Sequence, residues 1–146
     1  MMNNILTAIT WAFPKKEYLA KFANDDSAKN AAAKLWRSID QCDVCLVVVM
    51  AVMTLLVCWF YFFPYNQKPG RHYKPKYWRI FWIVNFVLVL VVSYFMSYAM
   101  AKNPSFDRGL LFQVSWVNAL YSLVLYWCIS WGFNASGKSN AYKTLY

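Results

Sequence analysis

The stretch VCLVVVMAVMTLLVCWFYFF, from Val44 to Phe63, contains twenty consecutive residues without a charged side chain. An α-helix rises 1.5 Å per residue, so about 20 apolar residues cross the hydrocarbon core of a bilayer, which is about 30 Å thick. The stretch is rich in valine, which favours strands in water. In lipid, however, an isolated strand leaves its backbone without hydrogen-bond partners. The stretch therefore predicts a transmembrane helix.

Two later stretches have the same character, residues 80–100 with twenty-one residues and residues 110–131 with twenty-two, both free of charge. Residues that break helices separate the three stretches, such as the Pro69-Gly70 and Asn103-Pro104 pairs. We predict an all-α, polytopic membrane protein. Its transmembrane region, residues 44–131, contains three helices at 44–63, 80–100 and 110–131.

The composition supports a membrane location. Apolar residues make up 60% of the chain and charged residues 14%, against about 45–50% and about 25% in soluble domains. Aromatic residues reach 21% of the 146 residues, and a globule of this size cannot bury so many large apolar side chains. A water-soluble monomer and a disordered chain are both excluded.

Residues 1–43 form a different segment, which holds five of the six acidic residues. We predict short amphipathic helices here, one of them capped by Asp25, Asp26 or Ser27. In the helix that follows this cap, apolar and polar residues each recur at the helical period and so form two faces. The apolar face contains Ala28, Ala31, Ala32, Leu35 and Ile39. The polar face contains Lys29, Asn30, Lys34, Arg37 and Gln41. The helix either docks on a partner or the lipid headgroups, or folds against the chain's own loops. Residues 132–146 are predicted to form a polar C-terminal tail.

The first connection, residues 64–79, carries five basic side chains and no acidic one: Lys68, Arg71, Lys74, Lys76 and Arg79. Such a loop is typical of attraction to anionic lipid headgroups. The alternative is a docking surface for an acidic partner protein. Aromatic rings alternate with these charges, but beside a membrane we expect no nucleic-acid partner.

The orientation follows from the basic residues near the spans. The first connection and the tail together carry seven, and the other side carries eight, of which five lie near the spans: Lys29, Lys34, Arg37, Lys102 and Arg108. The positive-inside rule therefore places the loop 64–79 and the C-terminal tail in the cytoplasm. We expect a bacterial inner membrane, with a mitochondrial inner membrane as the alternative.

The sequence contains little that could catalyse a reaction. No ionisable acid or base lies within the three charge-free stretches, and His72 is the only histidine. Cys42 and Cys45 have a Cys-x-x-Cys spacing, but a zinc site needs about four ligands, and Cys58 and Cys128 lie at the far ends of their spans. We therefore expect no enzyme activity, no cofactor and no metal.

Small and polar residues recur within the second and third spans. Counted from the side of the first connection, Ser93 and Asn118 both lie about 20 Å deep at helical rise, so they are predicted to face each other. Such residues either join packed helices or line a pore made by several copies. The candidates are Asn85, Ser93, Ser97, Ser115, Asn118 and Ser122.

These patterns favour a non-catalytic integral membrane subunit that anchors or scaffolds a larger multi-protein assembly, such as a secretion or injection machine or a respiratory complex. Its expected partners are anionic lipids and other membrane subunits. The alternative is a homo-oligomeric pore or a holin-like, membrane-permeabilising protein, whose partners are copies of itself.

Overall fold

The computed structural model describes residues 15–66 and 75–135, of which 88% are helical and none lies in a strand. Three helices are long and apolar enough to cross a membrane, and the predicted all-α polytopic fold is thereby confirmed. The elements in chain order are α2 (Lys15–Ala20), α3 (Asp26–Phe60), the π-helix η1 (Tyr61–Tyr65), α4 (Pro75–Met100) and α5 (Arg108–Ala135).

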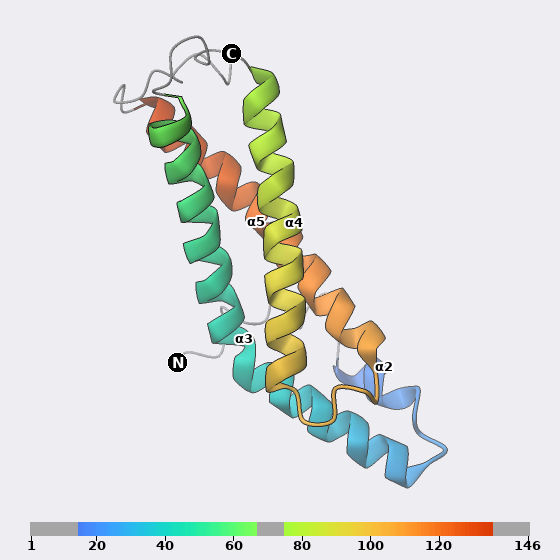
Figure 1. Ribbon diagram of the computed structural model, residues 1–146. Helices are drawn as coiled ribbons and strands as arrows, with labels where there is room; N and C mark the ends of the chain where they lie inside the picture. The colour runs from blue at the N-terminus through green and yellow to red at the C-terminus, as the bar shows by residue number, and fades with distance from the viewer. Residues whose placement is uncertain (1–14, 67–74, 136–146) are drawn as a thin grey trace, which may run out of the picture.

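The three long helices form one bundle in which each helix contacts the other two. Figure 1 shows α5 running obliquely behind α4, with α3 beside them. Large apolar side chains cover the outer surface, where Phe95 is 65% and Val124 62% exposed. Lipid is the environment that such a surface requires. The protein is an integral membrane protein.

Helix α3 begins in the polar segment and continues into the first charge-free stretch without interruption, so the boundary expected at residue 43 is not a break in the backbone. Its N-terminus is capped by Asp25, whose Oδ1 accepts hydrogen bonds from the backbone N–H groups of Ser27 at 2.8 Å and Ala28 at 3.2 Å. The bonds from the Ser27 hydroxyl and these amides lower the pKa of Asp25, so the cap stays charged. Asp25 was one of the three predicted caps.

We call α2 together with residues 26–43 of α3 the headpiece. Its buried core contains Tyr18, Leu35 and Trp36, which pack against Leu110 and Leu111 at the start of α5. The rings of Tyr18 and Trp36 lie 5.5 Å apart. The apolar face of this helix is therefore covered by the protein's own chain. Of the two predicted alternatives, the structure has the helix folded against its own chain.

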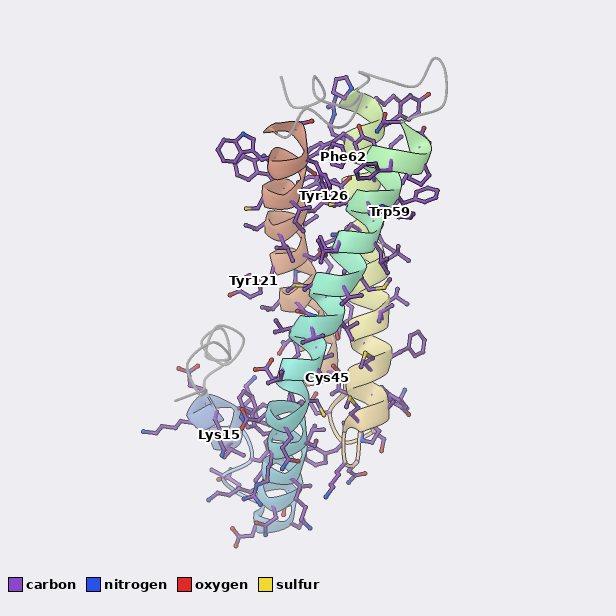
Figure 2. All side chains as sticks on the ribbon, turned by 90° about the vertical axis from the view of Figure 1, so that its left-hand side faces the viewer. Lys15, Cys45, Trp59, Phe62, Tyr121 and Tyr126 are labelled. Carbon is purple, nitrogen blue, oxygen red and sulfur yellow. The ribbon has the colours of Figure 1, made fainter. Side chains whose placement is uncertain are left out.

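The headpiece projects beyond the ends of α4 and α5 in both views (Figures 1 and 2). It is tied to the α4–α5 connection by Ser38, whose hydroxyl accepts a hydrogen bond from the backbone N–H of Lys102 at 3.2 Å. Burial raises the pKa of the Tyr18 hydroxyl, and the nearby Asp107 carboxylate raises it further, so Tyr18 stays neutral. The position of the headpiece relative to the bundle is thus set by both packing and hydrogen bonding.

At the opposite end of the bundle, the first span runs through Pro64 and ends at Tyr65, although the sequence pattern placed its end at Phe63. Proline has no N–H and breaks the ordinary α-helical ladder. Here the last turn widens to a π-helix, and the side-chain amide of Asn66 donates to the Tyr61 carbonyl at 2.6 Å. The widened turn lets the helix accommodate a residue that would normally end it.

An aromatic cluster closes this end of the bundle. Phe62 and Tyr126 are buried in it, and the indole N–H of Trp78 donates to the Ser130 hydroxyl at 3.1 Å. Figure 2 shows Tyr126 within the bundle and Tyr121, five residues earlier on α5, pointing away from it. At this end, the packing of the helices is therefore fixed by hydrogen bonds from aromatic side chains as well as by the apolar surface that the rings bury.

We predict that Leu35→Ala loosens the headpiece while leaving the bundle inserted. Leu35 is fully buried, and truncating a buried leucine costs about 2–5 kcal/mol. Hydrogen exchange should rise in residues 15–40 and stay unchanged in α4. Asn30→Ala, at an exposed site on the same helix, is the control. Equal exchange in the two variants would contradict the assigned core.

Candidate functional site

Six polar residues of the second and third spans lie inside the bundle rather than on its surface. We call these six residues the polar seam. All six are at most 2% exposed: Asn85, Ser93, Ser97, Ser115, Asn118 and Ser122. Polar groups in hydrocarbon are costly without partners, so the contacts that they make with one another decide what the seam can do.

Asn118 holds the centre of the polar seam. Its side-chain amide donates to the hydroxyl of Ser93 on α4 at 2.7 Å and to the backbone carbonyl of Leu46 on α3 at 3.3 Å. The prediction that Ser93 and Asn118 face each other is confirmed. Through this one side chain α5 is bonded to both of the other spans.

A second polar contact lies nearer the first connection. The Asn85 amide donates to the hydroxyl of Ser122 at 3.2 Å and to its carbonyl at 3.3 Å. Ser115 and Ser122 also donate to carbonyls of their own helix, those of Leu111 and Ala119. Within one chain, this arrangement joins α4 to α5 and leaves these side chains facing the interior.

Asp43 directly precedes the first charge-free stretch, and the structure places its side chain inside the protein. Its side chain is 3% exposed, and neither carboxylate oxygen has a hydrogen-bond partner in the described part of the chain. It lies seven residues after the buried Trp36 and seven before the buried Met50, so it shares the inward face of α3. The spacing of seven residues places Asp43 on the same face of α3 as Trp36 and Met50, but the sequence alone does not show that this face turns inward.

The basic residues expected to bind lipids or a partner divide into two groups. Lys76 and Arg79 are exposed in the first two turns of α4, whereas Lys68, Arg71 and Lys74 lie outside the described residues. The described chain carries a second basic surface on the headpiece, where Lys29, Lys34 and Arg37 are exposed on one side of α3 and Asp26 and Asp40 flank them. We call these three basic residues the cationic face.

The four cysteines are free, with Cys42 and Cys58 buried and Cys128 exposed. Cys58 donates a weak hydrogen bond through its thiol to the Tyr126 carbonyl at 3.9 Å. Over residues 15–66 and 75–135, no group of three or more His, Cys, Asp or Glu side chains is placed to hold a metal ion. The chemistry that these residues offer is hydrogen bonding between helices and charge at the headpiece surface.

Comparison with protein-family models, curated proteins and solved structures finds no match to this chain. The features that bear on the function are therefore the polar seam and the cationic face.

We predict that Asn118 and Ser93 are energetically coupled. A double-mutant cycle of Asn118→Leu and Ser93→Ala, measured by unfolding in mixed micelles, should give a coupling between the mean of about 0.6 kcal/mol and the maximum of about 1.7 kcal/mol found for hydrogen bonds between membrane helices. Pairing Asn118→Leu with Leu120→Ala, on the exposed side of α5, should give none. Equal coupling in the two cycles would show that the contact does not hold the bundle together.

We also predict that Asp43→Asn stabilises the protein at pH 8. The substitution keeps the shape of the side chain and removes a charge that is buried without a partner. The gain should shrink on acidification, because protonation also neutralises the native carboxylate. The matched control is Asp40→Asn, at an exposed position one turn away. A loss of stability in Asp43→Asn would contradict the unpaired placement.

Proposed function

We propose that the protein is a non-catalytic integral membrane subunit that anchors or scaffolds a larger multi-protein assembly. The observation that carries this proposal is the continuity of α3, which makes the exposed cationic face a direct extension of a membrane-spanning helix. The bundle holds the headpiece at a fixed place beside the membrane, and the headpiece presents charged side chains to a partner.

The attachment of the headpiece supports an anchoring role. A docking surface on a flexible tether would position its partner only loosely. Here the packing of Tyr18, Trp36 and Leu111 and the bond from Lys102 to Ser38 connect the headpiece to the start of α5 and the end of α4. A partner bound to the headpiece would therefore be held in one orientation relative to the bundle.

The cationic face is suited to an acidic surface of a partner protein. Lys29, Lys34 and Arg37 are all exposed, and none of them is paired with an acid in the described part of the chain. Exposed charges steer association and choose the partner more than they add affinity. Asp26 and Asp40 at the two ends of the face would limit how a partner aligns along the helix.

The position of the polar seam favours the subunit over the homo-oligomeric pore. A pore between copies needs polar side chains on the outside of each bundle, where Phe95 and Val124 lie instead. Asn118 and Ser122 are buried and already bonded within one chain. Lining a pore with them would require these internal contacts to be given up.

For the location, we propose a bacterial inner membrane with residues 64–79 and the C-terminal tail in the cytoplasm, as the distribution of basic residues favours. The headpiece would then lie on the opposite side, because α3 crosses the membrane once between the headpiece and residue 64. The proposed docking surface therefore serves a partner outside the cytoplasm.

We predict that Lys34→Glu with Arg37→Glu releases the partner subunits that co-purify with the protein in mild detergent, because it reverses the centre of the cationic face. Membrane insertion should be unchanged. The control is Lys15→Glu with Lys16→Glu, which changes the same charge on exposed positions of α2. Native mass determination of the purified species is the measurement.

Two outcomes of this experiment would contradict the proposal. One is a species whose mass is an integer multiple of 17.2 kDa with no other protein, which would favour the self-assembled pore. The other is equal loss of partners in the two variants, which would show that the overall charge, not the cationic face, holds them.

A further inference from the structure

A groove runs along the outside of the bundle between α4 and α5, and we call it the α4–α5 groove. Its volume is about 530 Å³, within the range of small-molecule sites. Except at one end, the side chains that line it are apolar or aromatic: Leu90, Val91, Tyr94, Phe95 and Phe112. Because it opens on the outer surface of a membrane-spanning bundle, its surroundings are the acyl chains of the bilayer.

The groove lies in the half of the bundle nearer the headpiece. It begins beside Arg108, the first residue of α5, and reaches Leu90, which lies ten residues before the end of α4 at Met100. Ten residues of helix span about 15 Å, and half of the hydrocarbon core is also about 15 Å. The lining residues of α4, from Leu90 to Phe95, therefore lie about 7–15 Å from the end of that helix, within the leaflet on the headpiece side.

Arg108 is the only charged residue of the lining. Its side chain is exposed, and it forms no salt bridge within the part of the chain that the structure describes. The neighbouring Asp107 uses its Oδ1 to accept the N–H of Leu110 at 3.0 Å and cap α5. The guanidinium thus lies at the polar end of an apolar groove. Its planar array of N–H donors can bind two oxygens of a phosphate.

Gly109 keeps this end of the groove open. The residue lies in the lining next to Arg108, and it adds no side chain to the groove. A Cβ atom at this position would come within 3.1 Å of the Asp107 Oδ1 that caps α5. The absence of a side chain therefore serves both the cap and the opening of the groove.

We propose that the α4–α5 groove is a binding site for one anionic phospholipid of the leaflet on the headpiece side. One acyl chain lies in the groove along Val91, Phe95 and Phe112, and the phosphate binds Arg108. The inference is independent of the proposed function, because it makes no use of the cationic face.

A second groove provides an internal comparison. It lies between α3 and α4, has a volume of about 440 Å³, and is lined only by uncharged, mostly apolar side chains, among them Leu56, Trp59, Phe81 and Val84. With no basic residue in its lining, it offers nothing that distinguishes one headgroup from another. We expect it to take acyl chains without preference for an anionic lipid.

The test is native mass spectrometry of the full chain in mild detergent, titrated with phosphatidylglycerol or with phosphatidylcholine of the same acyl chains. Arg108→Gln should weaken the first phosphatidylglycerol about fivefold, the effect of one basic residue near an anionic surface, and leave phosphatidylcholine unchanged. Lys102→Gln removes a nearby exposed charge that is not in the lining, and it should change neither affinity.

A matched pair of variants tests the apolar part of the site. Val91 and Val84 are both exposed valines of α4, one in each groove. Val91→Trp should fill the α4–α5 groove and weaken the first phosphatidylglycerol at least fivefold, whereas Val84→Trp should not affect it. Neither substitution disturbs a buried position, so both proteins should remain folded.

Two results would overturn the proposal. Equal loss of phosphatidylglycerol affinity in Arg108→Gln and Lys102→Gln would show diffuse attraction to a basic surface rather than a site. Unchanged affinity in Val91→Trp, or equal loss in Val84→Trp, would show that the acyl chain does not lie in the α4–α5 groove.

Discussion

The amide of Asn118 contacts all the spans at once: it belongs to α5 and donates to Ser93 on α4 and to the Leu46 carbonyl on α3. In hydrocarbon, apolar helix surfaces gain no hydrophobic energy by meeting, because lipid tails are equally apolar. Polar groups without partners are costly there. The need to pair these few groups therefore decides which faces of the three helices meet, and the outward position of the aromatic and branched side chains follows from it.

This constraint also explains how the bundle and the headpiece divide their roles. Inside the membrane the six residues of the polar seam face the centre of the bundle, and Asn118 and Asn85 use their amides to join the helices. Beyond the membrane edge water returns, and the pattern reverses: apolar Leu35 and Trp36 are buried while Lys34 and Arg37 are exposed. The buried residues of α3 lie on one inward face in the headpiece and in the membrane, so the helix passes from one environment to the other without a break.

Much of this could be predicted from the sequence, since charge-free length locates spans and the period of 3.6 residues locates faces. The Asp25 cap and the contact between Ser93 and Asn118 follow from spacing along single helices. The continuity of α3 through residue 43 does not, because a change of solvent alters composition but not helix geometry. The inward position of Asp43 and the α4–α5 groove depend on how helices are rotated and cross, which only the tertiary structure determines.

The unbroken course of α3 has a consequence for the headpiece. A continuous helix fixes rotational phase: each residue turns the face by about 100° and advances it by 1.5 Å. The direction in which Lys34 and Arg37 point is therefore set by the register in which Leu46 and Met50 enter the bundle. The number of residues between Arg37 and Leu46 therefore sets the direction in which the headpiece presents its basic side chains, and inserting or deleting one residue there would turn that direction by about 100°.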